Sequence, residues 1–173
     1  MEPMDRPNNS KAERNDMFSK RNPWLAVILL TTLEQGLKVV INNYSLLVTT
    51  PILRPWLYFS PMFNRDYSWI NSMLKLNLGR WFHIILVAGL LIFVYLFYRF
   101  IQYSLKTDRL INTTFAFLFA GAICSLIDKV FWNGSLDYIQ VRGMFTFDLK
   151  DAYINVFIGL FVLMVVKIGR AHV

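Results

Sequence analysis

Residues 81–98 read WFHIILVAGLLIFVYLFY, and this stretch decides the fold class. Its 18 residues include no Lys, Arg, Asp or Glu. A helix needs about 20 apolar residues to cross the roughly 30 Å of hydrocarbon in a bilayer. A charge-free stretch of this length therefore predicts a transmembrane helix.

Three further apolar stretches lie on either side of it, at residues 24–44, 110–127 and 152–166. The last two contain no charge, whereas the first contains Glu34 and Lys38. The final stretch has only 15 residues, so it spans a bilayer only if its helix begins near Phe147 or continues past Lys167. We expect an all-α membrane protein whose four transmembrane helices form one domain, residues 23–167.

The composition of the whole chain agrees with a membrane protein. Of 173 residues, 55% are hydrophobic and 17% are charged, and the mean hydropathy is +0.41. A soluble domain is seldom this apolar. The amount of apolar surface also excludes intrinsic disorder over most of the chain. The single cysteine, Cys124, excludes a disulfide scaffold. The net charge of +7 does not predict nucleic-acid binding, because the basic residues do not gather on one segment beside aromatic residues.

The positions of Lys and Arg predict the orientation in the membrane. Residues 1–22 hold five of them, the short link at 99–109 holds three, and the end of the chain from Lys167 holds two. Short basic segments stay on the cytoplasmic side. We therefore expect residues 1–22 to be a polar cytoplasmic tail, with both termini cytoplasmic. The connections at 45–80 and 129–150 would then form a small extracytoplasmic cap of short β and amphipathic helix elements.

The end of the chain, residues 168–173, reads IGRAHV. This sequence matches the in-frame translation of a common sequencing adapter. We interpret these residues as a non-native tail without functional meaning.

Charged residues within or beside the spans are costly in a bilayer and usually mark function. Glu34 and Lys38 are four residues apart, so they share one face of a helix and can pair. This pair could serve function, or it could be a structural ion pair that binds the first helix to the bundle.

Two aspartates are placed at the ends of neighbouring spans. Asp128 follows the third apolar stretch and Asp151 precedes the fourth, so antiparallel helices bring both to the outer membrane boundary. Two close carboxylates can share a proton, as in aspartic proteases. The alternative is that each aspartate caps its helix or pairs with an adjacent lysine.

Short motifs surround these charges and follow one another in a fixed order. They are EQGLK at residues 34–38, NRDYSW at 64–69, GAICSLIDK at 121–129, a further acid at Asp137, and FDLKD at 147–151. In this order and at these depths they resemble the boxes of the signal peptidase II family, four-span aspartic proteases of bacterial membranes. The resemblance covers residues 24–166, and Asp128 and Asp151 match the catalytic pair.

Several motif positions depart from the family pattern. In the helix boxes, D-x-x-x-K and G-x-x-x-N-x-x-D-R, Glu34 replaces Asp, Ser125 replaces Asn and Lys129 replaces Arg. The last change loses the bidentate fork of a guanidinium group. In the loop box, N-x-G-x-A/S-F/W, Asp66 replaces Gly, which forbids or displaces a positive φ in that turn.

The box before the fourth span differs at two nearby positions. The family has F-N-x-A-D, whereas this chain has Asp148 for Asn and Lys150 for Ala. Asp148 adds a third carboxylate near the pair, and the charge of Lys150 partly cancels it. We interpret the chain as a divergent member, in which substrate range and inhibitor sensitivity are altered more than the chemistry.

The resemblance implies a membrane aspartic endopeptidase that removes the signal peptide from prolipoproteins, cleaving just before the cysteine that carries diacylglycerol. It assigns catalysis to Asp128 and Asp151. It assigns substrate binding or support of the site to Asn64, Ser125, Lys129, Asp137, Asp148, Glu34 and Lys38. The partners would be the prolipoprotein and membrane lipids, with no nucleic acid and no cofactor. No spacing of His and Cys fits a metal site.

The same resemblance implies a place in the bacterial plasma membrane, with the active site at the extracytoplasmic face, and we expect a monomer. Two other functions remain open on the sequence alone. The substituted boxes also fit an inactive homologue that binds lipoproteins or membrane partners without cleavage. A transporter that uses the buried charges as a proton relay is disfavoured, because Asp128 and Asp151 lie at the membrane boundary and not at its midplane.

Overall fold

The computed structural model describes residues 23–104, 109–132 and 134–170, so the tail at 1–22 and residues 171–173 lie outside the described residues. Four long helices run through the described chain: α2 (Pro23–Tyr44), α4 (Arg80–Ser104), α5 (Arg109–Ile127) and α6 (Leu149–Arg170). Each is long and apolar enough to cross a membrane. The predicted four-span helical fold is confirmed. The short fourth stretch reaches a spanning length because α6 extends beyond it at both ends, and the apolar span within α6 is Leu149–Lys167.

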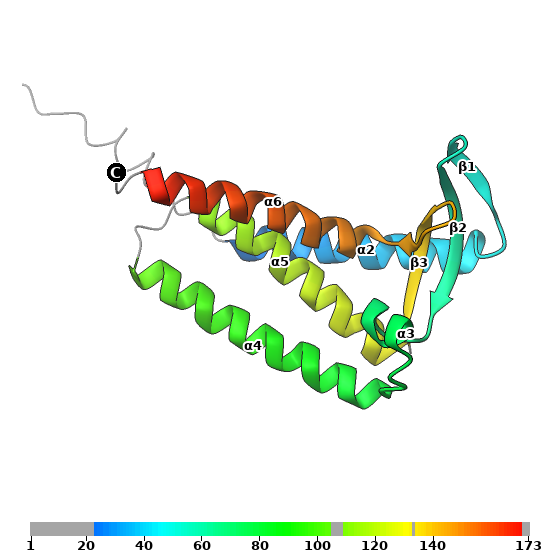
Figure 1. Cartoon of the computed structure of the whole chain (residues 1–173), viewed down its shortest axis with the longest axis horizontal. Helices are drawn as coiled ribbons and strands as arrows, with labels where there is room; N and C mark the ends of the chain where they lie inside the picture. The colour runs from blue at the N-terminus through cyan, green and yellow to red at the C-terminus, as the bar shows by residue number, and fades with distance from the viewer. Residues whose placement is uncertain (1–22, 105–108, 133, 171–173) are drawn as a thin grey trace, which may run out of the picture.

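The bundle is organised around α5, which packs against α2, α6 and α4 (Figure 1). Small side chains on α5 let its neighbours approach closely. At Gly121 an added Cβ would lie 3.0 Å from the Ile154 side chain and 3.3 Å from the carbonyl oxygen of Lys150. Gly121 therefore sets the spacing between α5 and the first turns of α6.

A small antiparallel sheet covers one end of the bundle, which we call the cap end (Figure 1). Its strands, in spatial order, are β1 (Thr50–Leu53), β2 (Leu57–Asn64), β3 (Ser135–Val141) and β4 (Thr146–Phe147). The pairing of β2 with β3 joins the two connections that the sequence assigned to the cap, with Asn64 opposite Ser135 and Met62 opposite Asp137. The predicted cap of short β elements is confirmed.

The link from the sheet to α4 contains a short helix, α3 (Trp69–Leu74), which has exposed apolar side chains, as expected of an amphipathic cap element. Ser68 caps α3 by accepting a hydrogen bond from the Asn71 amide at 3.2 Å. In the preceding turn Tyr67 has a φ of 63°. The positive φ thus falls one residue after Asp66, the position that carries Gly in the family pattern.

A π-helical turn, η1 (Asp128–Trp132), continues α5 into the cap. Such turns disturb the regular backbone hydrogen bonding and leave carbonyl groups in need of partners. Arg80, at the start of α4, donates from Nε to the carbonyl of Lys129 at 2.7 Å and from its terminal nitrogen to the carbonyl of Val130. Arg80 therefore ties α4 to the turn that begins with Asp128.

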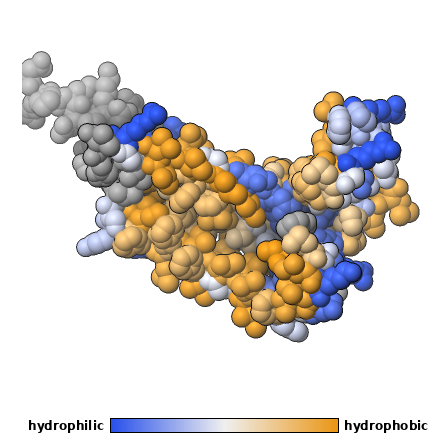
Figure 2. All heavy atoms as spheres, in the orientation of Figure 1, coloured by the Kyte–Doolittle hydropathy of each residue, from blue (hydrophilic) through white to orange (hydrophobic). Residues whose placement is uncertain are grey.

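Away from the cap, the helices enclose an apolar cluster that we call the apolar centre. Its buried members are Val27, Tyr98, Ile101, Ile111, Phe115, Ala116, Phe119 and Met164. Hydrophobic residues also cover the visible sides of the helices, whereas hydrophilic residues gather toward the two ends, mainly at the cap (Figure 2). A surface of this kind suits a bundle surrounded by lipid.

Candidate active site

Beneath the cap, the helix ends and the sheet enclose a cluster of ionisable side chains that we call the charged centre. Its members are Glu34, Lys38, Asp128, Asp137, Asp148, Lys150 and Asp151. All except the half-buried Asp151 are buried. Buried charges are tolerated when they are paired and hydrogen-bonded, so the contacts within this cluster decide what it can do.

Lys38, on α2, lies at the middle of the charged centre and is fully buried. Its Nζ is 3.1 Å from Glu34 Oε1, 2.6 Å from Asp128 Oδ2 and 2.7 Å from Asp148 Oδ2. The structure thus forms the pair of Glu34 and Lys38 that their spacing indicates. The same ammonium also connects α2 to η1 and to the residue that precedes α6.

Glu34 is held from the sheet by Tyr138. The Tyr138 hydroxyl donates to Glu34 Oε2 at 2.9 Å and accepts from the Leu149 amide at 3.2 Å. Burial raises the pKa of Tyr138 above its ordinary value, so the hydroxyl remains a donor. One phenol group therefore joins α2 to β3 and to the first residue of α6.

Asp128 begins η1 and has no solvent exposure. Its Oδ1 accepts from Gln35 Nε2 at 3.1 Å, and Gln35 in turn accepts from Trp132 Nε1 at 3.0 Å. The orientation of the Asp128 carboxylate is thus fixed on one side by Gln35, while Lys38 lies on the other.

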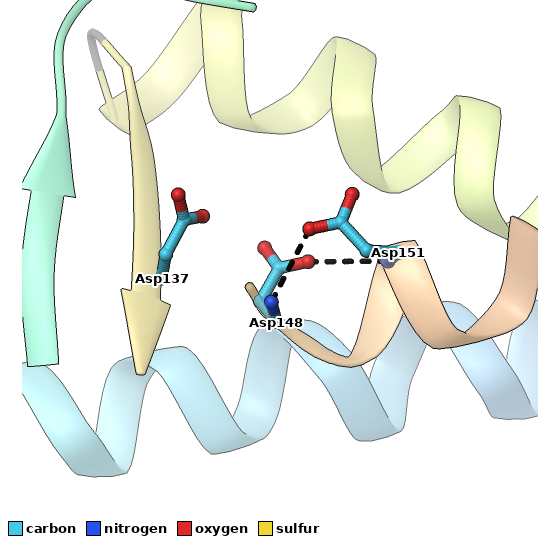
Figure 3. A group of neighbouring side chains, drawn as sticks. All are labelled: Asp137, Asp148 and Asp151. Atoms are coloured by element: carbon cyan, nitrogen blue, oxygen red, sulfur yellow. Dashed lines mark hydrogen bonds between the residues drawn. The ribbon is translucent and has the colours of Figure 1, made fainter. Parts of the chain in front are cut away.

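Asp148 and Asp151 form a reciprocal cap at the start of α6. Asp148 Oδ1 accepts from the Asp151 amide at 3.3 Å, and Asp151 Oδ2 accepts from the Asp148 amide at 3.3 Å, as drawn in Figure 3. This is the capping-box arrangement, with carboxylates at both positions. Within the described residues the Asp151 carboxylate has no ion pair, whereas Asp148 pairs with both Lys38 and Lys150.

Asp148 is ionised in this setting although it is fully buried. Burial opposes ionisation, but Lys150 and Lys38 outweigh it and hold the pKa of the Asp148 carboxyl below its usual value. The partial cancellation of charge that the sequence indicated for Asp148 and Lys150 takes the form of a direct ion pair.

Asp137, on β3, points toward Asp148 (Figure 3) and lies at the sheet side of the charged centre. Ser135 donates to Asp137 Oδ1 at 2.7 Å, and Asn64 donates to Asp137 Oδ2 at 3.4 Å. Burial raises the pKa of Asp137 above its ordinary value, while Lys150 opposes that rise.

Ser135 is the shared contact of the cluster. Its Oγ also lies 3.1 Å from Asp128 Oδ2 and 3.2 Å from Asp148 Oδ2, and it accepts from Lys150 Nζ at 2.7 Å. A hydroxyl has one proton to donate, so it can satisfy only one carboxylate at a time. The remaining carboxylates depend on the two lysines.

The two aspartates that match the catalytic pair therefore lie in one cluster. Asp128 contacts Lys150, Lys150 contacts Asp148, and Asp148 is bonded to Asp151. Within the described residues no direct hydrogen bond joins Asp128 to Asp151. The two contacts that the alternative interpretation expects, helix capping and pairing with lysine, are also present. Asp151 takes part in the cap of α6, and Asp128 pairs with lysines.

Three residues that the sequence assigned to substrate binding or support remain: Ser125, Lys129 and Asn64. Ser125 and Lys129 lie beside the charged centre and contact each other. Lys129 donates to Ser125 Oγ at 2.8 Å, one helical turn earlier. Asn64 contacts Asp137 and also accepts from the Asp66 amide at 3.1 Å, which shapes its loop. Within the described residues, Lys129 makes no hydrogen bond or ion pair with a carboxylate.

Three carboxylates of the centre are close enough to ligate a cation. One oxygen from each of Asp137, Asp148 and Asp151 lies within 4.8 Å of the others. Lys150 Nζ already lies 3.7 Å from Asp137 and in contact with Asp148. The lysine supplies positive charge in this place, so the residues do not favour a metal.

Sequence reasoning missed several residues that hold the charged centre or the turn beside it, namely Gln35, Ser135, Tyr138, Trp132 and Arg80. Gln35 lies between Glu34 and Lys38 in an apolar stretch, and that polar interruption was the one available signal. The others come from the cap or its edges, where no sequence spacing relates a strand to a helix end.

The comparisons with known proteins agree with this architecture. A sequence profile described as Signal peptidase (SPase) II matches residues 26–167. The chain belongs to the signal peptidase II family. The resemblance inferred from five motifs is thereby confirmed, and the chain is a transmembrane member of a family of proteases.

Individual relatives of this signal peptidase II family member are distant. A protein named lipoprotein signal peptidase from Shouchella clausii (strain KSM-K16) is 24% identical over 155 residues, which cover 85% of this chain and 94% of that protein. A solved bacterial membrane enzyme has a TM-score of 0.71 at 18% identity, covering 84% of this chain and 92% of that one. Another has a TM-score of 0.69 at 19% identity, covering 84% and 87%. These structures share the fold.

Proposed function

We propose that this signal peptidase II family member is a lipoprotein signal peptidase that works as an aspartic endopeptidase. Its substrate is a prolipoprotein whose cysteine carries diacylglycerol, and it cleaves the peptide bond just before that cysteine. The observation that carries the proposal is the placement of the buried Asp128 and the half-buried Asp151 in one charged centre at the cap end.

The chemistry needs one ionised and one protonated carboxyl group. The ionised aspartate takes a proton from a water molecule, and the oxygen of that water attacks the carbonyl carbon of the scissile bond. The protonated aspartate donates a hydrogen bond to the carbonyl oxygen as negative charge develops there. The C–N bond then breaks, and the amine of the cysteine leaves with a proton from the carboxyl pair.

The depth of the centre suits a substrate embedded in the membrane. Asp128 and Asp151 lie at the ends of spans, so a signal helix lying beside the bundle would place its end near them. The distribution of Lys and Arg supports an extracytoplasmic location for this end and a cytoplasmic location for both termini. Asn64 and Ser125 are the polar side chains we assign to the substrate backbone.

The direct test uses the purified chain in detergent with a diacylglyceryl-modified prolipoprotein. The wild-type protein should release the signal peptide. In Asp128→Asn and in Asp151→Asn the cleavage rate should fall by at least about 100-fold, the lower end of the range for loss of general acid–base catalysis. Asp66→Asn is the matched control, since it removes a carboxylate from the cap outside the centre, and it should cleave like wild type. Cleavage that survives either active-site substitution would refute the carboxyl pair.

A second function is supported by the place of Lys150 within the charged centre. A lysine among the carboxylates could stop the proton exchange that the chemistry needs, leaving a protein that binds lipoproteins without cutting them. In that case a column carrying the folded wild-type protein would retain the lipidated prolipoprotein, and no cleaved signal peptide would be released.

A further inference from the structure

Lys150 is a buried lysine at a position that carries Ala in the family pattern. Its side chain, at the second residue of α6, turns into the charged centre and is 7% exposed. Nζ contacts Asp148, donates to Ser135 Oγ at 2.7 Å and lies 3.3 Å from Asp128 Oδ2. Burying an ammonium group is costly unless carboxylates compensate it, so this placement depends on its acidic neighbours.

The lysine contacts divide the two catalytic candidates unequally. Asp128 Oδ2 is shared by Lys38 at 2.6 Å and Lys150 at 3.3 Å. Asp151 accepts only the backbone amide of Asp148 among the described residues and has no ammonium group at ion-pair distance, although Lys150 also attracts its charge from farther away. Coulomb attraction in a buried site thus favours negative charge on Asp128 over Asp151.

The number of charges points the same way. The centre contains five carboxyl groups, those of Glu34, Asp128, Asp137, Asp148 and Asp151, and two ammonium groups, those of Lys38 and Lys150. Full ionisation would leave an excess of buried negative charge, so protons must be retained where lysines are absent. Lys129 adds positive charge nearby through its place next to Asp128, but its hydrogen bonds go to Ser125.

We propose that Lys150 is a positioning residue that keeps Asp128 ionised as the general base and leaves the transferable proton on Asp151. The inference rests on the function proposed above. Asp148 completes the arrangement as the counter-ion of Lys150, so the two departures from the family pattern act as one unit. Neither side chain touches substrate.

The coupling between the two departures follows from the contacts of Lys38. If Lys150 is removed alone, the Asp148 carboxylate has only Lys38, 2.7 Å away, and competes with Asp128 for it. If Asp148 is also changed to Asn, that competition ends and Lys38 is left to Asp128. The double variant should therefore work better than the single one.

The experiment compares wild type, Lys150→Ala, Lys150→Arg, Asp148→Asn and the double variant Asp148→Asn/Lys150→Ala as full chains in detergent. Cleavage of a diacylglyceryl-modified prolipoprotein gives kcat and KM for each. Lys150→Ala should lower kcat by about 30-fold, within the range for a charged hydrogen-bond partner, with KM changed less than about 3-fold. Lys150→Arg and the double variant should remain within about 5-fold of wild type.

Arg142→Ala is the matched control, because it removes a basic side chain of the cap that contacts Tyr58 outside the centre. Elution as a single species and a cooperative melting transition establish folding. If Lys150→Ala does not fold, Lys150→Arg and the double variant still decide, since a folded but inactive double variant overturns the inference. So does a double variant whose loss equals the product of the two single losses, or a Lys150→Ala protein with wild-type kcat.

The two proposals fail in different ways. Absence of cleavage by folded wild type refutes the proposed function and this inference with it. Cleavage by wild type with independent effects at positions 148 and 150 refutes only the role of Lys150.

Discussion

Among the described residues, the apolar centre and the charged centre are buried clusters made of opposite kinds of residue. The apolar centre is filled by aromatic and aliphatic side chains such as Phe115 and Phe119, which need only good packing. The charged centre, a few turns along the same helices, contains carboxylates and lysines that each depend on the others. Removing one member of the first leaves a gap, whereas removing one member of the second leaves a buried charge without a partner.

The helices α2 and α6 contribute to both centres, and η1 continues α5 from the apolar centre into the charged one, so the difference lies mainly in the residues. On α2, Val27 belongs to the apolar centre and Lys38 to the charged one. Phe115 on α5 and Asp128 in η1, which continues α5, divide in the same way. A stable helix bundle does not need the charges at the cap end. Their cost is a reason to assign them to function.

The largest expected effect comes from Lys38→Met, which keeps the volume and removes the ammonium group. Three carboxylates would lose an ammonium partner within 3.1 Å, and we expect the chain to lose about 3–5 kcal/mol of stability, as when a buried ion pair is broken. Thermal unfolding in detergent measures this, with Val27→Ala on the same helix as control. A Lys38→Met protein as stable as wild type would show that the two centres do not differ in this way.

A smaller loss is expected from Phe115→Ala, in the apolar centre. The substitution removes a fully buried ring that packs against Tyr98 and Phe119, at a cost of about 3 kcal/mol in stability, the lower end of the range for Phe→Ala in a core. The folded fraction should keep the kcat of wild type within about 2-fold, because no catalytic contact changes. Melting curves and kinetics on the same preparation test this, and a large fall in kcat would contradict the separation of the centres.

Two glutamines allow a matched comparison at the next level. Gln35→Leu removes the donor to Asp128 and the acceptor for Trp132, so kcat should fall about 10-fold, as for a hydrogen bond to a charged group. Gln102→Leu removes a donor to Tyr98 beside the apolar centre and should leave kcat unchanged. If Gln35→Leu and Gln102→Leu changed kcat equally, the charged centre would be no more important for catalysis than the surroundings of the apolar centre.

The smallest effect concerns the pH dependence of stability. Because burial raises the pKa of Asp137, the folded chain binds this proton more tightly than the unfolded chain, and stability declines as pH rises from about 4 through the raised pKa. Asp137→Asn should remove that decline, gaining about 2–4 °C in Tm over wild type at the alkaline end and nothing near pH 4.

The measurement is a series of melting curves from pH 4 upward. This range avoids Asp148, whose lowered pKa stabilises the fold above pH 4 and loses that effect only in more acidic solution. A difference between Asp137→Asn and wild type that shrinks as the pH rises would contradict the sign.

Hydrophobic stretches predicted the spans and the helical class, because length and absence of charge are properties of each segment alone. The depth of Asp128 and Asp151 followed from the rise of a helix. Which side chains meet across helices depends on packing, and no spacing in the sequence showed that Lys150 turns inward to Asp128 or that Ser135 lies among three carboxylates. The length of α6 also exceeded its apolar stretch, because the polar residues at its start are satisfied by the cap.

The two hydrogen bonds from Arg80 to the carbonyls of η1 have a mechanical consequence. They fasten the cap end of α4 to the turn that carries Asp128, while the rest of α4 leans mainly on α5. If α4 moves away from α5 to admit a substrate helix from the lipid, it would rotate about its cap end, which Arg80 holds in place. This fixed point lies next to Asp128. The separation between α4 and α5 would therefore increase most at the end far from the cap, and Asp128 would stay in position.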